Sequence, residues 1–445
     1  MNAHRFTTGD LIRLIIPLMI DQTLASTVGM FDTIMVAAAG ESAVAGVSLV
    51  NSINILFNYL FTALAVGGAI IAGQYLGRGD RETSSVAARH LVIVSVLFSS
   101  TVTVLCLALN RPVLSLFFGN IAPDVMESAR SYFYITALAC PFIALFSSGA
   151  ALFRGMGDSK TPMIIAVVMN VINIAGNALF IYGFGWGAFG AGLATTLSRI
   201  VSAVAVIWLL RNPKRPIFVR AFHFKNIDRE MIKRVFKIAV PNGLENSFFQ
   251  AGKIVLASLV TTFGTTAVAA NAVVQSIASI EVIPSFSAGL AVTTVVAQCA
   301  GAGEYGEAEY YIKRLLKWSY VFMTVLNGLI LLALNPILAL YHLTAETFHL
   351  AWQIAAIHGI AAIMLYPASF MLPNAFRAAG DVKFPMWVSI LTMLIFRIGS
   401  AYVFAYFLGM GALSVWFSMI LDWAVRSVCF VWHWRNDKWK TKTVI

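Results

Sequence analysis

The chain has 445 residues, of which 59% are hydrophobic and only 11% are charged. A soluble domain has about 25% charged residues, so this composition excludes a soluble enzyme or binding domain and predicts an all-α polytopic membrane protein. The formal net charge of +11 does not indicate a nucleic-acid partner, because the basic residues gather in loops on one side of the predicted membrane spans.

Twelve apolar stretches are long enough to cross a bilayer as helices. The second, eighth and tenth exceed the length that a span needs, and we expect them to tilt, to kink at Pro284 or Pro367, or to continue past the bilayer. The predicted spans are 11–38, 44–76, 90–110, 128–153, 163–183, 188–210, 235–263, 267–302, 316–341, 348–376, 385–407 and 411–434.

Lysine and arginine mark one side of the predicted membrane. With the N-terminus and every even-numbered loop taken as cytoplasmic, that side holds most of the 31 basic residues, and the opposite side holds only Arg111 and Arg130. The positive-inside rule then places both termini in the cytoplasm. We expect a multi-pass protein of the cell (inner or cytoplasmic) membrane.

The two halves of the chain repeat each other at an almost constant spacing. Pro17 recurs as Pro241, and the same spacing relates Gln74 to Gln298, Gly77 to Gly301 and Gly79 to Gly303. Later in the repeat the spacing is one residue shorter and relates Arg154 to Arg377, Gly157 to Gly380 and Asp158 to Asp381. Such spacing indicates an internal duplication. Two parallel six-helix repeats would enclose a central cavity. We expect an N-lobe (1–210), a basic cytoplasmic linker (211–234), a C-lobe (235–434) and a cytoplasmic tail (435–445).

The first predicted span carries two carboxylates on one face. Asp21 and Asp32 are 11 residues apart, about three helical turns, where an ionised side chain costs roughly 2.5–3.5 kcal/mol. Counted from Arg13, Asp32 lies roughly 28 Å along the helix, toward the outer side of the membrane. The repeat spacing makes Glu245 the counterpart of Asp21, so we expect these two acids to face each other across the cavity.

The sequence shows no motif for ATP hydrolysis or for enzymatic catalysis. There is no Gly-x-x-x-x-Gly-Lys-Ser/Thr phosphate-binding loop and no visible constellation of catalytic nucleophiles. We therefore expect neither an enzyme nor an ATP-driven pump. The functions that remain possible are ion-coupled secondary transport and a channel.

Three motifs resemble those of one transporter family. They are Pro17 to Val36, ending in Phe31-Asp32-Thr33-Ile34-Met35-Val36; Gln74-x-x-Gly77-x-Gly79 after the second span; and Phe153-Arg154-Gly155-x-Gly157-Asp158-x-Lys160-x-Pro162 after the fourth, echoed by Phe376-Arg377-Ala378-Ala379-Gly380-Asp381-x-Lys383-x-Pro385 after the tenth. Because these motifs occur in the family's order and spacing, the chain resembles the multidrug and toxic compound extrusion (MATE) family over nearly its whole length. The resemblance implies a V-shaped, two-lobed antiporter that exports organic, often cationic and amphipathic compounds against an inward flow of protons or sodium.

The resemblance assigns ion coupling to the N-lobe. Asp32 follows the first-helix Pro17 at the position of the family's coupling aspartate. In members with an N-lobe proton site, an Asn of the fifth helix is followed one helical turn later by Asp, whereas here Asn173 is followed by Asn177. This departure removes one titratable group and leaves protons and sodium open as coupling ions.

A C-lobe sodium site built like the family's is not expected. Members with such a site use acidic residues of the seventh and tenth helices. Glu245 lies earlier in the seventh span than the family position, where Phe249 and Gln250 stand, and the tenth span has no carboxylate.

Other polar residues within the spans line a cavity or pair with one another. Lys253 is close enough in direction to Glu245 to share a helix face, and its expected partner is Glu245 or Glu281. Asp422 and Arg426, one turn apart, predict a structural ion pair, and His349 and His358 are expected to be structural or interfacial. The cavity candidates are Asp21, Glu245, Gln250, Lys253, Glu281, Asn51, Asn54 and Gln275, although hydrogen bonds between helices explain the amides equally well.

Proton-coupled export of organic compounds is the preferred hypothesis. In it Asp32 takes up a proton, Asn173 and Asn177 exchange partners, and the first helix bends at Pro17, where a backbone hydrogen bond is missing. The expected partners are small organic substrates and membrane lipids, with no cofactor, no metal and a monomeric state.

Two other functions stay open. A flippase for a lipid-linked or polyanionic precursor would need a cationic cavity, for which Lys253 and Arg397 are the available residues. A channel would show uncoupled downhill flux.

Overall fold

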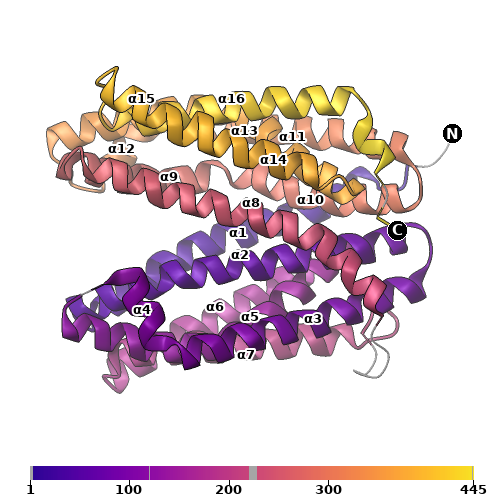
Figure 1. The fold of residues 1–445 in the computed structure, drawn as a ribbon, viewed down its shortest axis with the longest axis horizontal. Helices are drawn as coiled ribbons and strands as arrows, with labels where there is room; N and C mark the ends of the chain where they lie inside the picture. Colours follow the sequence, from indigo (N-terminus) through magenta and orange to yellow (C-terminus); the bar gives the residue numbers. More distant parts are fainter. Residues whose placement is uncertain (1–3, 120, 220–227, 443) are drawn as a thin grey trace. The chain divides into compact units, whose positions relative to one another are not determined.

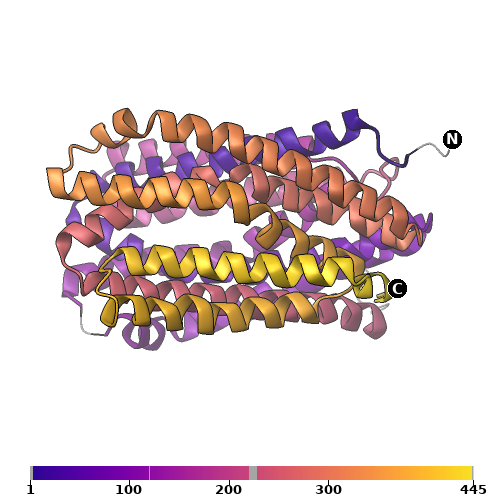
Figure 2. The same cartoon turned by 90° about the horizontal axis from the view of Figure 1, so that it is seen from above.

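A computed structural model describes residues 4–119, 121–219, 228–442 and 444–445, and helices are the only regular elements in these ranges. The chain divides into two compact units. The N-terminal unit is Ile12–Gly243, and the C-terminal unit combines Met1–Leu11 with Leu244–Ile445. Within each unit long helices run side by side (Figures 1 and 2).

The N-terminal unit is a bundle in which α5 is central. It packs against α2, α3 and α7, and α6 packs against α7. The helices are α1 (Thr8–Ala37), α2 (Glu41–Gly77), α3 (Arg81–Ala108), α4 (Asn110–Phe118), α5 (Pro123–Gly155), α6 (Lys160–Asn177), the π-helix η1 (Ala178–Gly183) and α7 (Gly187–Leu210).

The C-terminal unit repeats this packing around α13. That helix packs against α9, α10, α11 and α16, as α5 does against α2, α3 and α7. The helices are α8 (Arg229–Thr261, shared with the first unit), α9 (Thr265–Glu281), α10 (Ile283–Gly301), α11 (Tyr305–Leu332), α12 (Leu334–Ala339), α13 (Ala345–Ala379), α14 (Lys383–Thr392), the π-helix η2 (Met393–Gly399), α15 (Ser400–Tyr406), α16 (Leu413–Arg435) and the 3-10 helix η3 (Lys438–Thr441).

The predicted spans correspond to these helices. In the described part of the chain, eleven helices are long and apolar enough to cross a membrane. The further predicted span, 235–263, falls on α8, whose apolar stretch is interrupted by Glu245, Gln250 and Lys253. At the expected kink the helix is interrupted for one residue: α9 ends at Glu281, Val282 keeps right-handed helical angles, and Pro284 lies in the first turn of α10. In contrast, α13 continues through Pro367.

Repeated glycines end helices at equivalent points of the two units. Gly157 has a backbone φ of +89° and Gly380, its counterpart, has +105°. Only glycine adopts this left-handed region without steric cost. The aspartate that follows the first glycine caps the next helix, because the Asp158 carboxylate accepts a hydrogen bond from the Thr161 backbone at 2.9 Å. In the first copy the Gly-Asp motif therefore ends one helix and begins the next, whereas in the second copy Asp381 pairs with His433 of α16 at 2.8 Å.

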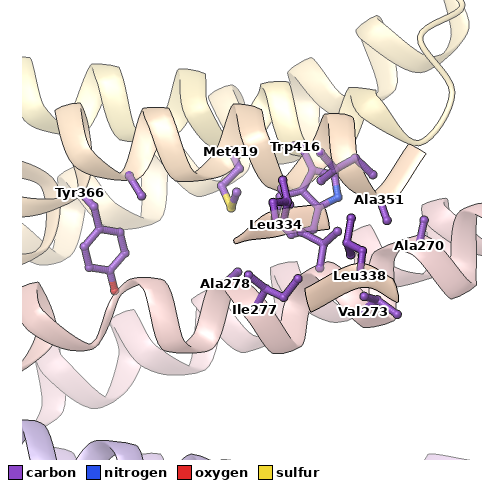
Figure 3. Close-up of a cluster of buried hydrophobic side chains, with 14 of the residues drawn as sticks. Ala270, Val273, Ile277, Ala278, Leu334, Leu338, Ala351, Tyr366, Trp416 and Met419 are labelled. Atoms are coloured by element: carbon purple, nitrogen blue, oxygen red, sulfur yellow. The ribbon is translucent and has the colours of Figure 1, made fainter. Parts of the chain in front are cut away.

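Small residues allow close helix packing in the core. A Cβ atom on Gly46 of α2 would lie 2.7 Å from the Ala129 backbone of α5, and one on Gly149 would lie 2.6 Å from Val206 of α7. Such close approach is typical of membrane helix packing. In the C-terminal unit, Figure 3 shows Trp416 and Met419 of α16 among buried side chains of α9 and α12.

Both ends of the chain attach to the beginning of α11. The N-terminal residues His4 and Arg5 pair with Glu307 at 2.9 Å and Glu304 at 3.1 Å. Near the C-terminus, Lys440 pairs with Glu309 at 2.8 Å. These charged groups lie beside one another at one end of the C-terminal unit.

Candidate ion-coupling site

The N-terminal unit holds Asp32 among side chains from two other helices. The side-chain amide of Asn177, the last residue of α6, donates a hydrogen bond to Oδ1 of Asp32 in α1 over 2.8 Å. Arg199 of α7 interacts with Asp32 through its charge. We call these three residues the Asp32 cluster.

A second set of polar side chains adjoins the Asp32 cluster. The Tyr132 hydroxyl donates to Oδ1 of Asn51 at 3.1 Å, is hydrogen-bonded with Thr195, and interacts electrostatically with both charged members of the cluster. Asn173 donates to the Thr195 hydroxyl at 3.3 Å. Tyr132 and Thr195 thus connect Asn51 with Asn173. Sequence reasoning missed both connecting residues, because each is an isolated neutral polar side chain in an apolar stretch.

Two amide oxygens of α6, one of them on the Asn177 side chain that contacts Asp32, have spare capacity to accept hydrogen bonds. Asn173 and Asn177 are 5% and 1% exposed, and their Oδ1 atoms have no hydrogen-bond partner among the described residues. A buried acceptor without a partner costs about 1–3 kcal/mol. The site therefore offers oxygen atoms next to a carboxylate, which suits a proton or a small cation that prefers oxygen ligands.

The helix geometry changes immediately after Asn177. The α-helix α6 ends there and η1 continues as a π-helix. π-helical turns are rare in proteins and are frequently found at functional sites. In the C-terminal unit, η2 interrupts the corresponding span and carries Arg397.

Each unit pairs an acid of its first span with an arginine of its fourth. Glu245 accepts two hydrogen bonds from Arg377, both at 2.7 Å, and the two side chains are 11% and 10% exposed. One repeat earlier, the half-buried Asp21 interacts electrostatically with Arg154. Both acids therefore have a cationic partner within their own unit, and the predicted approach of Asp21 to Glu245 stays a prediction.

The expected pairing of Lys253 with Glu245 or Glu281 is wrong. Glu245 is held by Arg377, and Glu281 contacts His358 of α13. Lys253 is exposed, and the charge that acts on it comes from Arg397. Each acid thus takes its partner from a helix other than that of Lys253.

A cluster of buried charges joins α16 to η2. The expected pair of Asp422 and Arg426 is present at 3.0 Å, and Arg397 lies 3.5 Å from the same carboxylate. Both guanidinium groups lie over the Phe249 ring, at 5.2 Å for Arg397 and 5.7 Å for Arg426. This position on α8 corresponds to the acid of the C-lobe sodium site in the resembling family, and here it presents an aromatic face to two cations.

The remaining candidates stand apart from these groups. Asn54 and Gln250 are half-buried and Gln275 is exposed. Pro17 lies inside α1, which continues on both sides of it. Among the described residues, no three His, Cys, Asp or Glu side chains are grouped so as to hold a metal ion.

An all-helical protein with many membrane-spanning helices and with carboxylates held inside its bundles belongs to the broad class of membrane transporters. The MatE family model matches the chain twice, over residues 17–179 and 241–403. The second match begins at Pro241, the repeat counterpart of the Pro17 that begins the first, as the duplication predicts. The chain belongs to the MatE family of transporters and is not an enzyme.

Named relatives span almost the whole chain. A probable multidrug resistance protein NorM of Thermotoga maritima is 26% identical over 442 residues, covering 98% of this chain and 94% of its own. A probable multidrug resistance protein YoeA of Bacillus subtilis is 27% identical and covers 97% and 94%. This chain is thus similar to full-length transporters.

Solved structures share the fold. A crystal structure of MATE in complex with MaL6 has a TM-score of 0.90 at 22% identity and covers 98% of this chain and 97% of its own. A MOP superfamily transporter from Pyrococcus furiosus, described as having a binding pocket of reverse polarity, has a TM-score of 0.89 at 22% identity, with 98% and 96% covered.

Proposed function

We propose that this protein is a secondary active antiporter that exports organic, cationic or amphipathic compounds in exchange for protons. The observation that carries the proposal is the Asp32 cluster, in which three helices of one unit converge on a carboxylate within an otherwise apolar span. An intramembrane carboxylate is costly and marks ion pathways. The multidrug resistance names of the relatives support export of organic compounds.

Proton binding at Asp32 would change its hydrogen bonding. An ionised carboxylate only accepts hydrogen bonds, whereas a protonated one also donates. Protonated Asp32 could donate to the free Oδ1 of Asn177 or Asn173, and Arg199 would lose its counter-charge. These exchanges would act on α1 near Pro17 and on the π-helix that follows Asn177, where the backbone ladder is already altered.

Sodium is the alternative coupling ion at the same site. The free amide oxygens of Asn173 and Asn177 and the Asp32 carboxylate are the ligands that a hard cation prefers. We favour the proton because a protonated carboxyl needs only one acceptor, which a free amide oxygen supplies, whereas a bound cation needs several oxygen ligands at once.

The membrane setting completes the proposal. We place the protein in the cytoplasmic membrane with both termini inside, as the distribution of basic residues predicts. The attachment of both chain ends to α11 supports a common side for them. It would act as a monomer on small organic substrates, in contact with lipid and without a cofactor.

Flux measurements in proteoliposomes test this function. With ethidium as the probe cation and an imposed pH gradient, the wild type should accumulate ethidium against its gradient. Asp32→Asn should lose this coupled flux, and Asp124→Asn, an acid in the first turn of α5, is the matched control and should retain it. Unchanged coupled flux in Asp32→Asn would refute the role of Asp32.

A flippase for a lipid-linked or polyanionic precursor is the second candidate. The C-terminal unit favours it, because Arg397 and Arg426 share the single carboxylate of Asp422, and Lys253 lies near enough to Arg397 to interact with its charge. A surplus of positive charge suits an anionic head group. Transbilayer movement of a fluorescent anionic lipid that Lys253→Met abolishes, together with absent ethidium flux, would select this function.

A further inference from the structure

The C-terminal unit buries a carboxyl and an imidazole in direct contact. Glu281, the last residue of α9, meets Nδ1 of His358 in α13 through its Oε2 atom, and the two side chains are 1% and 3% exposed. They are 77 residues apart in the chain. Neither belongs to the Asp32 cluster, which lies in the other unit.

The second oxygen of Glu281 is left without a hydrogen bond. Oε1 is buried and has no partner among the described residues. It rests against Gly359, where an added Cβ would come within 3.2 Å of it. An ionised carboxylate needs its lone pairs satisfied when buried, so this environment suits a carboxyl group that shares a proton with the imidazole.

Aromatic rings surround His358 on its other side. The Trp416 and Trp423 rings of α16 each lie 5.3 Å from the imidazole, edge-on. Tyr366, two turns further along α13, packs edge-on against Trp423. The two tryptophans cover the imidazole with apolar surface, which raises the cost of any net charge on the pair.

Among the described residues, no other charged side chain forms an ion pair with Glu281 or His358. α9 and α10 carry no further charged residue, and those of α11 lie in its first half, from Glu307 to Lys317. On α16, Asp422 is bound by Arg426 and Arg397. In the described part of the unit, the carboxyl group and the imidazole are therefore each other's only ion-pair partner.

The pair lies at the interruption in the eighth span. α9 ends at Glu281, and Pro284 in the first turn of α10 has no backbone N–H to continue the ladder. The buried Asn327 side chain of α11 donates a hydrogen bond to the backbone carbonyl of Glu281 over 3.1 Å. The residue that carries the carboxyl group is thus held by a side chain from another helix at the junction of α9 and α10.

We propose that Glu281 and His358 form a second proton-binding site, which holds one proton shared between the two buried side chains where α9 meets α10. One proton keeps the pair neutral, either as carboxylic acid with imidazole or as carboxylate with imidazolium. Loss of the proton would leave an unpaired buried carboxylate, and a second proton an unpaired imidazolium. The site goes beyond the function proposed for Asp32 and does not depend on it.

Infrared difference spectroscopy tests this site without any substrate. Purified protein in lipid nanodiscs is titrated with acid and base, and the carboxylic-acid carbonyl band is followed. The wild type should show a titrating carboxyl component that Glu281→Gln removes. Asp32→Asn should leave that component in place, so failure of the Asp32 proposal and failure of this one are distinguishable.

Two further variants guard against a folding defect in Glu281→Gln. His358→Gln and Gly359→Ala both keep the carboxyl group but change its partner or its position, and each should shift the midpoint of the titrating component. Glu245→Gln is the matched control, because Glu245 is paired with a permanently charged arginine, and it should leave the component unchanged. A spectrum of Glu281→Gln identical to the wild type, or unshifted midpoints in both other variants, would overturn the proposal.

Discussion

In the C-terminal unit, one guanidinium nitrogen of Arg377 donates to both carboxylate oxygens of Glu245; one repeat earlier, Asp21 and Arg154 interact through charge. The repeat has kept an acid of the first span beside an arginine of the fourth, at the end where the Gly-Asp motif stops the helix. These groups belong to the framework of the transporter, because both copies retain them at the same spacing.

The ionisable groups deeper in each unit differ. The counterparts of Asp32 and Asn177 in the C-terminal unit are Leu256 and Ser400, and those of Glu281 and His358 in the N-terminal unit are Phe57 and Ile135. Neither buried site is therefore duplicated. The comparison therefore distinguishes a helical scaffold that both units share from two polar sites, one in each unit, that have no counterpart in the other.

The largest expected effect comes from breaking the ion pair in one unit and then in the other. Arg377→Gln leaves Glu245 buried without its two charged hydrogen bonds, which should cost about 3–5 kcal/mol of stability. Arg154→Gln should lower the stability less, because Asp21 is half-buried and interacts with Arg154 through charge alone, without a hydrogen bond that the substitution would remove. Thermal unfolding of both variants in the same detergent measures this order, and equal losses would contradict it.

A smaller effect is expected at the site that is not repeated. Asn177→Leu removes the donor to Asp32, and a hydrogen bond to a charged group is worth about 1.5–3 kcal/mol, so coupled ethidium flux should fall by at least about tenfold. Ser400→Ala changes the equivalent position of the other unit and should leave the flux unchanged. Similar losses in both variants would mean that the site is functionally duplicated after all.

The smallest effect concerns the chain ends on α11, outside the spans. Hydrogen bonds from Lys313 and Lys440 lower the pKa of Glu309 below its ordinary value of 4.5. Because the folded pKa is depressed, the contribution to stability is present above pH 4.5 and is lost as the pH falls through the folded value. Limited proteolysis of the C-terminal tail should therefore increase below pH 4.5 in the wild type. Glu309→Gln should show a weaker pH dependence, and an identical profile would argue against the attachment.

Local patterns in the sequence predicted most of the fold. The length of the apolar stretches predicted the membrane spans, and Pro284 predicted the interruption between α9 and α10. Fixed spacing revealed the duplication, which the paired family matches confirm. Pro367 shows the limit of such reasoning, because α13 continues through it where packing from neighbouring helices supports the chain.

The charged partners depend on tertiary packing and could not be read in the same way. Glu281 meets His358 across 77 residues, and nothing in the spacing of either residue indicates the other. The angle between Lys253 and Glu245 around one helix suggested that they pair, but this angle contains no information on Arg377, which reaches Glu245 from another helix. Sequence identified which polar groups needed partners, and the fold decided which partners they have.

Flux driven by separately imposed pH and sodium gradients tests the central claim most directly. Ethidium accumulation in wild-type proteoliposomes should follow the proton gradient at zero sodium gradient, and Asp32→Asn should abolish that response. Accumulation driven by sodium alone, or a proton response that survives Asp32→Asn, would contradict proton coupling at Asp32.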